Sequence, residues 1–139
     1  MSTIEERQNE VIEEFAIFND WMDKYEYLID LGKELDTLPE SEKTDDNLIK
    51  GCQSQVWLSA NYHHGKVFFK ADSDAIITKG IIALLIKVLS GLEPADIINA
   101  DLHFIDAIGL RENLSPTRSN GLVSMIKQIK MYALVFSNK

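Results

Sequence analysis

The chain has 139 residues, 45% of them hydrophobic and 26% charged, and its formal net charge is −8. This size and composition predict one globular domain over residues 1–139, large enough to fold around its own core. The lone cysteine excludes an internal disulfide, and the acidic balance argues against nucleic-acid binding because phosphate backbones attract basic surfaces.

The charge is unevenly distributed, and no segment has the pattern of a signal peptide or a membrane span. Residues 1–50 hold 15 acidic and 5 basic side chains, whereas residues 51–139 hold 7 and 9. The N-terminus lacks the basic start and apolar run of a secretory signal. The most apolar stretch, residues 80–89, includes Lys87 and is shorter than the ~20 residues that a bilayer-crossing helix needs. We therefore expect a cytoplasmic protein without a membrane partner.

Two amphipathic helices are predicted in the acidic first third. Residues 3–18 place apolar side chains at helical spacing among glutamates. Asn19 or Asp20 is a candidate N-cap for a second helix. The apolar stripe of this second helix consists of Trp21, Tyr25, Leu28 and Leu35. Residues 36–47 are polar, contain Pro39 and are expected to form a connection.

Alternating side chains predict an antiparallel hairpin in the middle of the chain. Residues 55–62 and 66–71 have strand-like patterns, and a His-His-Gly turn lies between them. A nearly all-apolar helix follows, and Gly91 is placed to end it. The candidate capping residues of this helix are Asp72, Ser73 and Asp74.

Helices are also predicted in the last third. A short one begins at residue 93, and another spans residues 102–108 and ends at Gly109. Ser115 followed by Pro116 is typical of the N-cap and first position of a longer helix. The predicted buried face of this last helix contains Leu122, Met125, Ile126, Ile129, Ala133 and Phe136. These elements together predict an α+β fold, with a small antiparallel sheet backed by several helices in two layers.

Cys52 is the candidate for chemistry, within the run GCQSQVW that begins at Gly51. Polar flanks and the neighbouring Lys50 favour a reactive thiolate. The alternative is that Cys52 packs as a small apolar side chain, as free cysteines usually do. The polar residues after it, which are Gln53, Ser54 and Gln55, either donate hydrogen bonds to a sulfur anion or stabilise the loop.

Arg118 lies in the first turn of the predicted last helix, where a cation costs ~0.3–1 kcal/mol. This unfavourable position suggests that the charge holds an anion. The alternative is an ion pair with Asp72, Asp74 or Glu112. Asn120 follows closely and is a candidate for polar contacts at the same corner. For Asp72 and Asp74, helix capping is expected ahead of contact with a partner.

Several kinds of site are excluded or disfavoured. None of the three histidines has metal-ligand spacing with Cys52, and structural zinc sites need several thiolates or imidazoles. One cysteine cannot hold an iron–sulfur cluster that needs four. There is no phosphate-binding glycine loop, nucleophile elbow or dinucleotide fingerprint. A cysteine hydrolase remains open and predicts a histidine nitrogen within about 4 Å of the sulfur.

Taken in chain order, five sequence blocks within residues 21–133 resemble the SufE family. The blocks are Tyr25-x-x-Leu28-Ile29-x-Leu31-Gly32-Lys33, Lys50-Gly51-Cys52-Gln53-Ser54-Gln55-Val56-Trp57-Leu58, Ala71-Asp72-Ser73-Asp74-Ala75, Lys79-Gly80 and Leu114-Ser115-Pro116-x-Arg118-Ser119-Asn120-Gly121-Leu122. The resemblance implies the fold that this family shares with iron–sulfur scaffold proteins of the NifU and IscU type.

The resemblance also implies a function. Members of the family take persulfide sulfur from a cysteine desulfurase of the SufS type, stimulate that enzyme, and pass the sulfur to an iron–sulfur scaffold complex of the SufBCD type. The pyridoxal phosphate of this system belongs to the desulfurase, so no cofactor is implied for this chain. By position, Cys52 is the acceptor. The matching positions near the acceptor loop and the desulfurase contact are Gly51, Gln53, Ser54, Gln55, Asp72, Asp74, Arg118 and Asn120.

These roles lead to a structural hypothesis. We expect Cys52 to rest in a partly sheltered pocket and to swing outward when a partner docks, with Gly51 supplying backbone freedom. A position inside regular secondary structure would contradict this motion. The competing functions are a thiol-dependent hydrolase and a non-catalytic adaptor that does not need the thiol.

Overall fold

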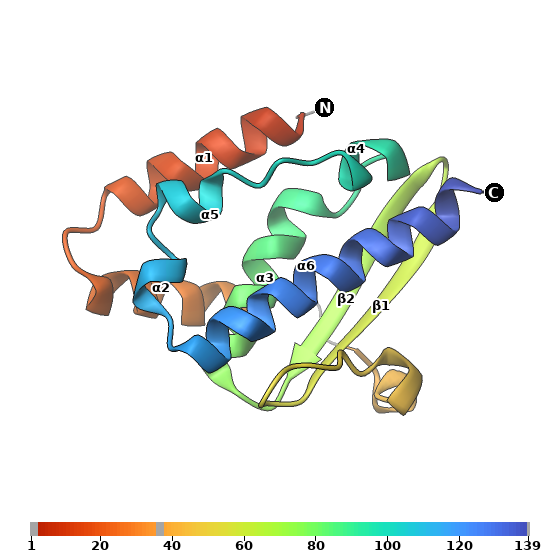
Figure 1. The fold of residues 1–139 in the computed structure, drawn as a ribbon, viewed down its shortest axis with the longest axis horizontal. Coiled ribbons are helices and arrows are strands. Elements are labelled where there is room, and N and C mark those ends of the chain that lie inside the picture. The colour runs from red at the N-terminus through yellow and green to blue at the C-terminus, as the bar shows by residue number, and fades with distance from the viewer. Residues whose placement is uncertain (1–2, 36–37, 139) are drawn as a thin grey trace.

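The computed structural model of the chain describes residues 3–35 and 38–138. The described residues form an α+β structure, which confirms the predicted fold class (Figure 1). Its helices and strands are α1 (Ile4–Ala16), α2 (Trp21–Glu34), β1 (Val56–His63), β2 (Lys66–Ser73), α3 (Ile76–Leu89), α4 (Pro94–Ile98), α5 (Phe104–Ala107) and α6 (Pro116–Ser137). Short 3-10 turns, which were not predicted, occupy Glu40–Glu42, Asp45–Asn47 and Arg111–Asn113.

The predicted hairpin is confirmed and is longer than expected. β1 pairs antiparallel with β2, from Val56 opposite Ser73 to His63 opposite Lys66. The turn consists of His64 and Gly65, with φ of 51° and 78°. Two consecutive positive φ angles match the right-handed twist of hairpin strands. The second strand, β2, continues to Ser73, two residues beyond the predicted end at residue 71.

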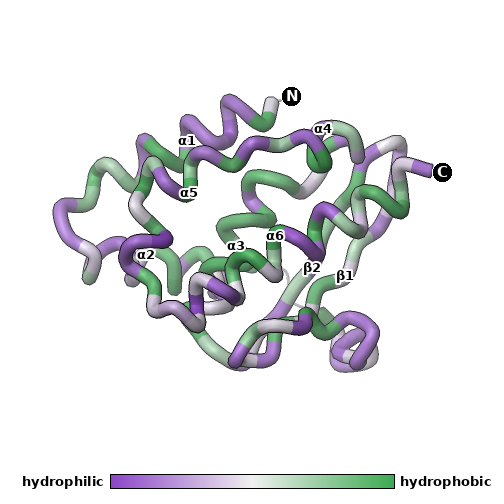
Figure 2. Tube along the Cα trace, in the orientation of Figure 1, coloured by the Kyte–Doolittle hydropathy of each residue, from purple (hydrophilic) through white to green (hydrophobic). Residues whose placement is uncertain are grey.

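The core lies between one face of this hairpin and the helices. Alternate strand residues are buried, and α3 contacts β2, α1, α2 and α6. Figure 2 shows that α3 is largely hydrophobic along its length, as a helix surrounded by other elements must be. Among the described residues, no helix combines the length and apolar character needed to cross a membrane.

Two glycines set the distance between α2 and α3. A Cβ added at Gly80 would overlap the carbonyl oxygen of Leu28, and one added at Gly32 would lie 3.0 Å from the Gly80 nitrogen. The two backbones approach too closely for any side chain at either position. This contact gives both glycines, which stand in the sequence blocks, a role in helix packing.

Helix capping agrees with prediction at two helices and differs at a third. Asp20 caps α2 by accepting from the Asp23 nitrogen at 3.0 Å, and Ser115 caps α6 by accepting from Arg118 at 3.3 Å. The capping prediction for α3 was wrong, because its N-cap is Ala75 and no side chain caps it. The strand β2 includes Asp72 and Ser73, and the side chains of Asp72, Ser73 and Asp74 have other partners. α5 is also shorter than the predicted span of residues 102–108.

Candidate functional site

Cys52 lies in irregular backbone between a turn at residues 50–51 and the start of β1. Its side chain is half-buried, and the Sγ atom donates to the carbonyl oxygen of Gly121 in α6 at 3.7 Å. Burial raises the pKa of the Cys52 thiol above its ordinary value. This corrects the expectation that Lys50 would favour the thiolate, since removal from water dominates in this conformation. The raised pKa favours the neutral thiol in this conformation.

A cavity of about 80 Å³ adjoins the sulfur. The Cys52 loop, α3 and α6 form its wall, and buried apolar side chains from the two helices contribute to it. Its lining residues are Cys52, Gln53, Ser54, Thr78, Ile81, Thr117, Arg118, Gly121 and Met125. Segments far apart in the sequence therefore meet at the sulfur, and three of the predicted supporting residues are among them.

Gly51 fits the loop closely against α6. Its φ is +91°, a backbone angle that residues other than glycine rarely adopt. A Cβ at this position would also overlap the hydroxyl of Ser124. Any other residue would strain the backbone and force either the Ser124 hydroxyl or the loop to move. Gly51 thus places Cys52 against α6.

The other end of the loop is tied to the corner that follows β2. The Gln55 nitrogen donates to Asp74 Oδ1 at 3.0 Å. In return, the Gln55 carbonyl accepts from the Ser73 hydroxyl at 2.7 Å and from the Asp74 nitrogen at 3.2 Å. Asp74 therefore braces the Cys52 loop instead of capping α3. Neither Gln55 nor Asp74 lines the cavity.

Asp72 is buried and forms two ion pairs, with Lys43 at 2.9 Å and with Lys79 at 3.2 Å. It also accepts from the Ser73 nitrogen at 2.8 Å. Burial acts to raise the pKa of Asp72, but hydrogen bonds from Lys43, Ser73 and Lys79 outweigh it and lower the pKa below its ordinary value. Asp72 joins the connection before β1 to the first turn of α3, and it stands outside the cavity.

Arg118 is exposed and lines the cavity. Within the described part of the chain it forms no ion pair, so the predicted alternative partners Asp72, Asp74 and Glu112 do not neutralise it. Asn120 is exposed and does not line the cavity. Lys50 is exposed and lines a neighbouring pocket on α6. The cation that shares the cavity with the sulfur is thus Arg118.

The histidines lie away from the sulfur. The rings of His63 and His64 contact each other at the hairpin turn, with centroids 4.0 Å apart, and His103 pairs with Glu5 at 3.1 Å. None of them lines the Cys52 cavity, so the described residues show no cysteine–histidine pair of the kind a hydrolase needs. Within residues 3–35 and 38–138, no group of three or more histidine, cysteine or acidic residues is arranged to hold a metal ion.

The SufE family model, described as an Fe-S metabolism associated domain, matches residues 9–133. The chain belongs to the SufE family. An uncharacterized SufE-like protein of Rhizobium meliloti is 39% identical over 130 residues, covering 90% of this chain and 93% of that protein. An uncharacterized SufE-like protein of Rhizobium etli is 41% identical over 132 residues, which cover 91% of this chain and 89% of that protein. An uncharacterized SufE-like protein of Synechocystis is 39% identical over 126 residues, which cover 91% of this chain and 79% of that protein.

A solved structure shares the fold. The solution structure of a hypothetical protein from Thermus thermophilus has a TM-score of 0.79 with this chain and covers 96% of it. This chain in turn covers 97% of that protein, at 18% sequence identity. The likeness concerns architecture alone, and it supports the α+β arrangement seen here. Membership of the SufE family gives the chain a role in iron–sulfur metabolism.

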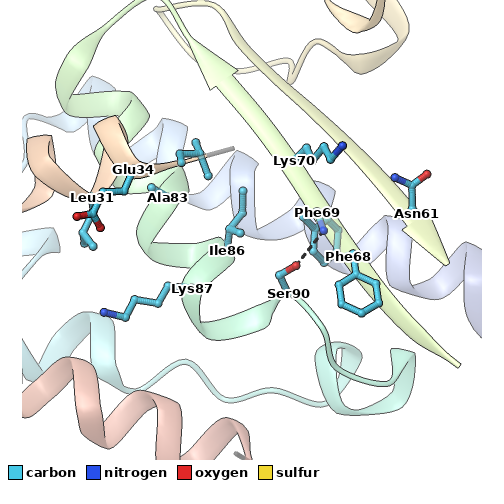
Figure 3. Close-up of a pocket in the computed structure, with 11 residues that line it drawn as sticks. Leu31, Glu34, Asn61, Phe68, Phe69, Lys70, Ala83, Ile86, Lys87 and Ser90 are labelled. Atoms are coloured by element: carbon cyan, nitrogen blue, oxygen red, sulfur yellow. Dashed lines mark hydrogen bonds between the residues drawn. The ribbon is translucent and has the colours of Figure 1, made fainter. Parts of the chain in front are cut away.

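A larger cavity, of about 470 Å³, lies between α2, α3 and β2 (Figure 3). It shares no residue with the Cys52 cavity, and it lacks a cysteine or a histidine. In its wall, the Ser90 hydroxyl accepts from the Phe69 nitrogen at 3.0 Å, so this polar group is already used in holding α3 to the hairpin. None of the predicted site residues of this SufE-family chain lines it. The smaller cavity, which contains Cys52, is therefore the better candidate for the functional site.

Sequence reasoning missed part of the Cys52 cavity. Thr78 and Ile81 contribute from α3, and Thr117 and Met125 contribute from α6. Thr78 is a buried polar residue on a largely apolar helix, and this exception was the signal that could have drawn attention to it. Thr78 and Cys52 are distant in the sequence, and only the packing of α3 against the loop brings them to the same cavity.

Proposed function

We propose that this protein is a persulfide carrier, which takes sulfur from a cysteine desulfurase onto Cys52 and passes it to an iron–sulfur scaffold complex. The observation that carries the proposal is the position of Cys52. The thiol stands in an irregular loop, at a small cavity with an exposed arginine, in a family associated with iron–sulfur metabolism. The pyridoxal phosphate belongs to the donor enzyme.

The chemistry is a thiol–persulfide exchange. The Cys52 thiolate attacks the outer sulfur of a persulfide on the donor cysteine, and a new sulfur–sulfur bond forms as the old one breaks. The donor cysteine leaves as a thiolate, so one sulfane sulfur moves and no external oxidant or reductant is consumed. The proton of the Cys52 thiol goes to solvent or to a base of the partner. Repetition of the exchange with the recipient returns Cys52 to its starting state.

The burial of Cys52 couples reactivity to docking. In the sheltered position, the raised pKa keeps the thiol protonated and slows reaction with oxidants. Outward movement breaks the 3.7 Å contact with the Gly121 carbonyl and returns the sulfur to water. The pKa of Cys52 then falls toward its ordinary value, and the thiolate forms outside the cavity, next to the persulfide of the docked donor. A partner that draws the loop outward thereby activates it.

The remaining site residues prepare this movement. Arg118 lines the cavity with Cys52, and a cation close to the sulfur would favour the charged form of the thiol as Cys52 moves outward. Gln53 and Ser54 supply polar groups beside it. Asp74 fixes the end of the loop at Gln55, so that displacement is confined to the residues around the cysteine.

Mass spectrometry of the intact protein tests the proposal directly. The protein is mixed with a cysteine desulfurase and free cysteine, and we expect a gain of one sulfur atom that a reducing agent removes. Cys52→Ser should still bind the desulfurase in a pull-down but should gain no sulfur. A Cys52→Ser protein that fully restores iron–sulfur enzyme activity in cells would instead indicate a non-catalytic adaptor. Absence of the added sulfur on the unaltered protein would refute the carrier function.

A further inference from the structure

One side of α6 carries an exposed apolar stripe. Val123, Lys127, Met131 and Leu134 recur at spacings of four, four and three residues, which places them on one face of the helix. The three apolar members are 53%, 51% and 55% exposed. Nothing in the described part of the chain covers them, and α6 crosses the front of the molecule (Figure 1). We call these four residues the α6 stripe.

The stripe carries one lysine and no acidic residue, in a protein that is acidic overall. After Glu112 the sequence contains no aspartate or glutamate, whereas residues 1–50 carry a net charge of −10. Lys127 is exposed and has no ion-pair partner among the described residues, and Lys50 flanks the stripe. A pocket of about 240 Å³ beside the stripe is lined by Lys50, Ser124, Lys127, Gln128 and Met131. No acidic side chain lines it.

The stripe is next to the Cys52 loop but outside the sulfur cavity. Gly51 packs against Ser124, and Lys50 stands two residues before Cys52. None of the four stripe residues lines the cavity. A protein bound along the stripe would therefore contact the flank of the loop and leave the cavity open. A recipient bound along the stripe would meet Cys52 once the loop has moved outward from the cavity.

We propose that the α6 stripe is the docking site for an acidic amphipathic helix on the protein that receives sulfur from Cys52. This inference rests on the proposed carrier function and names a surface for its second step. The stripe spans about 16 Å, or three turns, which suits a helix laid along a helix. The acidic first third repels an acidic partner, so electrostatic steering directs that partner to α6.

A membrane fits these features less well than a protein does. An anionic bilayer would repel the acidic first third, and interfacial helices usually place Trp or Phe among their buried residues. The α6 stripe contains neither. It offers a narrow apolar line with one cation on it and one beside it, which is the pattern that a single helix with glutamates beside its apolar face would match.

Binding of a defined probe tests the surface without any sulfur chemistry. The probe is a synthetic three-turn helical peptide with leucines on one face and glutamates on both sides, and its control replaces every glutamate with lysine. We expect amide shifts in the ¹⁵N-labelled protein to concentrate at the α6 stripe with the acidic peptide only. Met131→Asp should weaken this binding about tenfold or more. Met22→Asp is the matched control, since Met22 is a methionine that is 72% exposed on α2.

Sulfur transfer identifies the occupant. Loading of Cys52 by a desulfurase is measured first, and delivery from the loaded protein to a purified iron–sulfur scaffold complex is measured second. For Met131→Asp and Lys127→Glu we expect normal loading and delivery about tenfold slower. Met22→Asp and Lys33→Glu, which make the same changes on α2, should alter neither step.

Four results would overturn the inference. Peptide binding that survives Met131→Asp would remove the stripe as a docking surface, and unchanged delivery would remove the recipient as its occupant. An equal loss of loading would assign the stripe to the desulfurase. Sedimentation of the protein with phosphatidylserine vesicles, abolished by Met131→Asp, would assign it to a membrane. If the unaltered protein is never loaded, the carrier function fails, while the peptide result still decides whether the surface exists.

Discussion

The corner after β2 and the loop that carries Cys52 touch each other, yet they are held in different ways. At the corner, Asp72 has two lysine partners, and Ser73 and Asp74 make three hydrogen bonds with Gln55. At the cysteine, the Sγ contact with Gly121 is 3.7 Å long and the backbone is irregular. Segments with few buried contacts open at low cost. In the proposed carrier, the corner would act as a rigid frame and the Cys52 loop as the movable segment.

The largest expected effect comes from breaking the frame. Asp72→Asn leaves Lys43 and Lys79 facing a neutral amide, and we expect the free energy of unfolding at pH 7 to fall by about 1–3 kcal/mol. The pKa of Asp72 is lowered in the folded protein, so its contribution is complete above the unfolded value of about 3.9 and disappears as pH falls through the folded value. Urea unfolding at several pH values measures this. Equal stability of both proteins at every pH would contradict the role of Asp72 in the frame.

The next largest effect is expected at Gly51, which precedes Cys52 and seats the loop against α6. Gly51→Ala combines a positive φ with overlap of the Ser124 hydroxyl, and we expect a loss of about 1–2 kcal/mol in the free energy of unfolding and faster alkylation of Cys52. Gly65→Ala is the matched control, because its φ of +78° is also positive but its Cβ would meet nothing within 4 Å. Only Gly51→Ala should expose the thiol. Equal alkylation rates in both variants would mean that Gly51 does not seat the loop.

A change beside the cavity should affect transfer and leave the frame intact. For Arg118→Ala we expect sulfur loading of Cys52 to slow about tenfold, which corresponds to about 1.4 kcal/mol, while stability changes by less than about 0.5 kcal/mol. Arg111→Ala is a suitable control, since that arginine is exposed, pairs with Asp106 and stands outside the cavity. Loading rates from intact-mass time courses provide the measurement. Identical rates in the two variants would separate Arg118 from the chemistry.

The smallest effect is the pH dependence of the thiol in the free protein. Because burial raises the pKa of Cys52, its alkylation by iodoacetamide should reach half of its maximal rate above the ordinary thiol value of about 8.5. In urea the midpoint should return to that value. The same shift means that the stability contributed by the buried thiol is complete below about pH 8.5 and is lost as pH rises through the folded pKa. A midpoint below 8.5 in the folded protein would show that nearby cations outweigh burial.

Sequence patterns predicted correctly those features that depend on interactions between residues close together in the chain. Asp20 and Ser115 cap their helices because a side-chain oxygen needs only an amide a few residues away. The His64-Gly65 turn and the alternating strands followed from backbone sterics and side-chain periodicity. Asp72 and Asp74 were misassigned for the opposite reason, because their partners Lys43 and Gln55 are distant in sequence.

The sequence by itself determined the α+β class, the SufE-like blocks and the choice of Cys52, since composition, periodicity and motif order are properties of the chain. Only the tertiary structure showed in which direction the pKa of the thiol is shifted. Whether a cysteine is a buried, neutral thiol or an exposed anion depends on the low-dielectric groups around it, and these come from α3 and α6. It likewise decided that Asp72 and Asp74 form a frame and that one side of α6 stays uncovered, because both depend on which distant segments pack together.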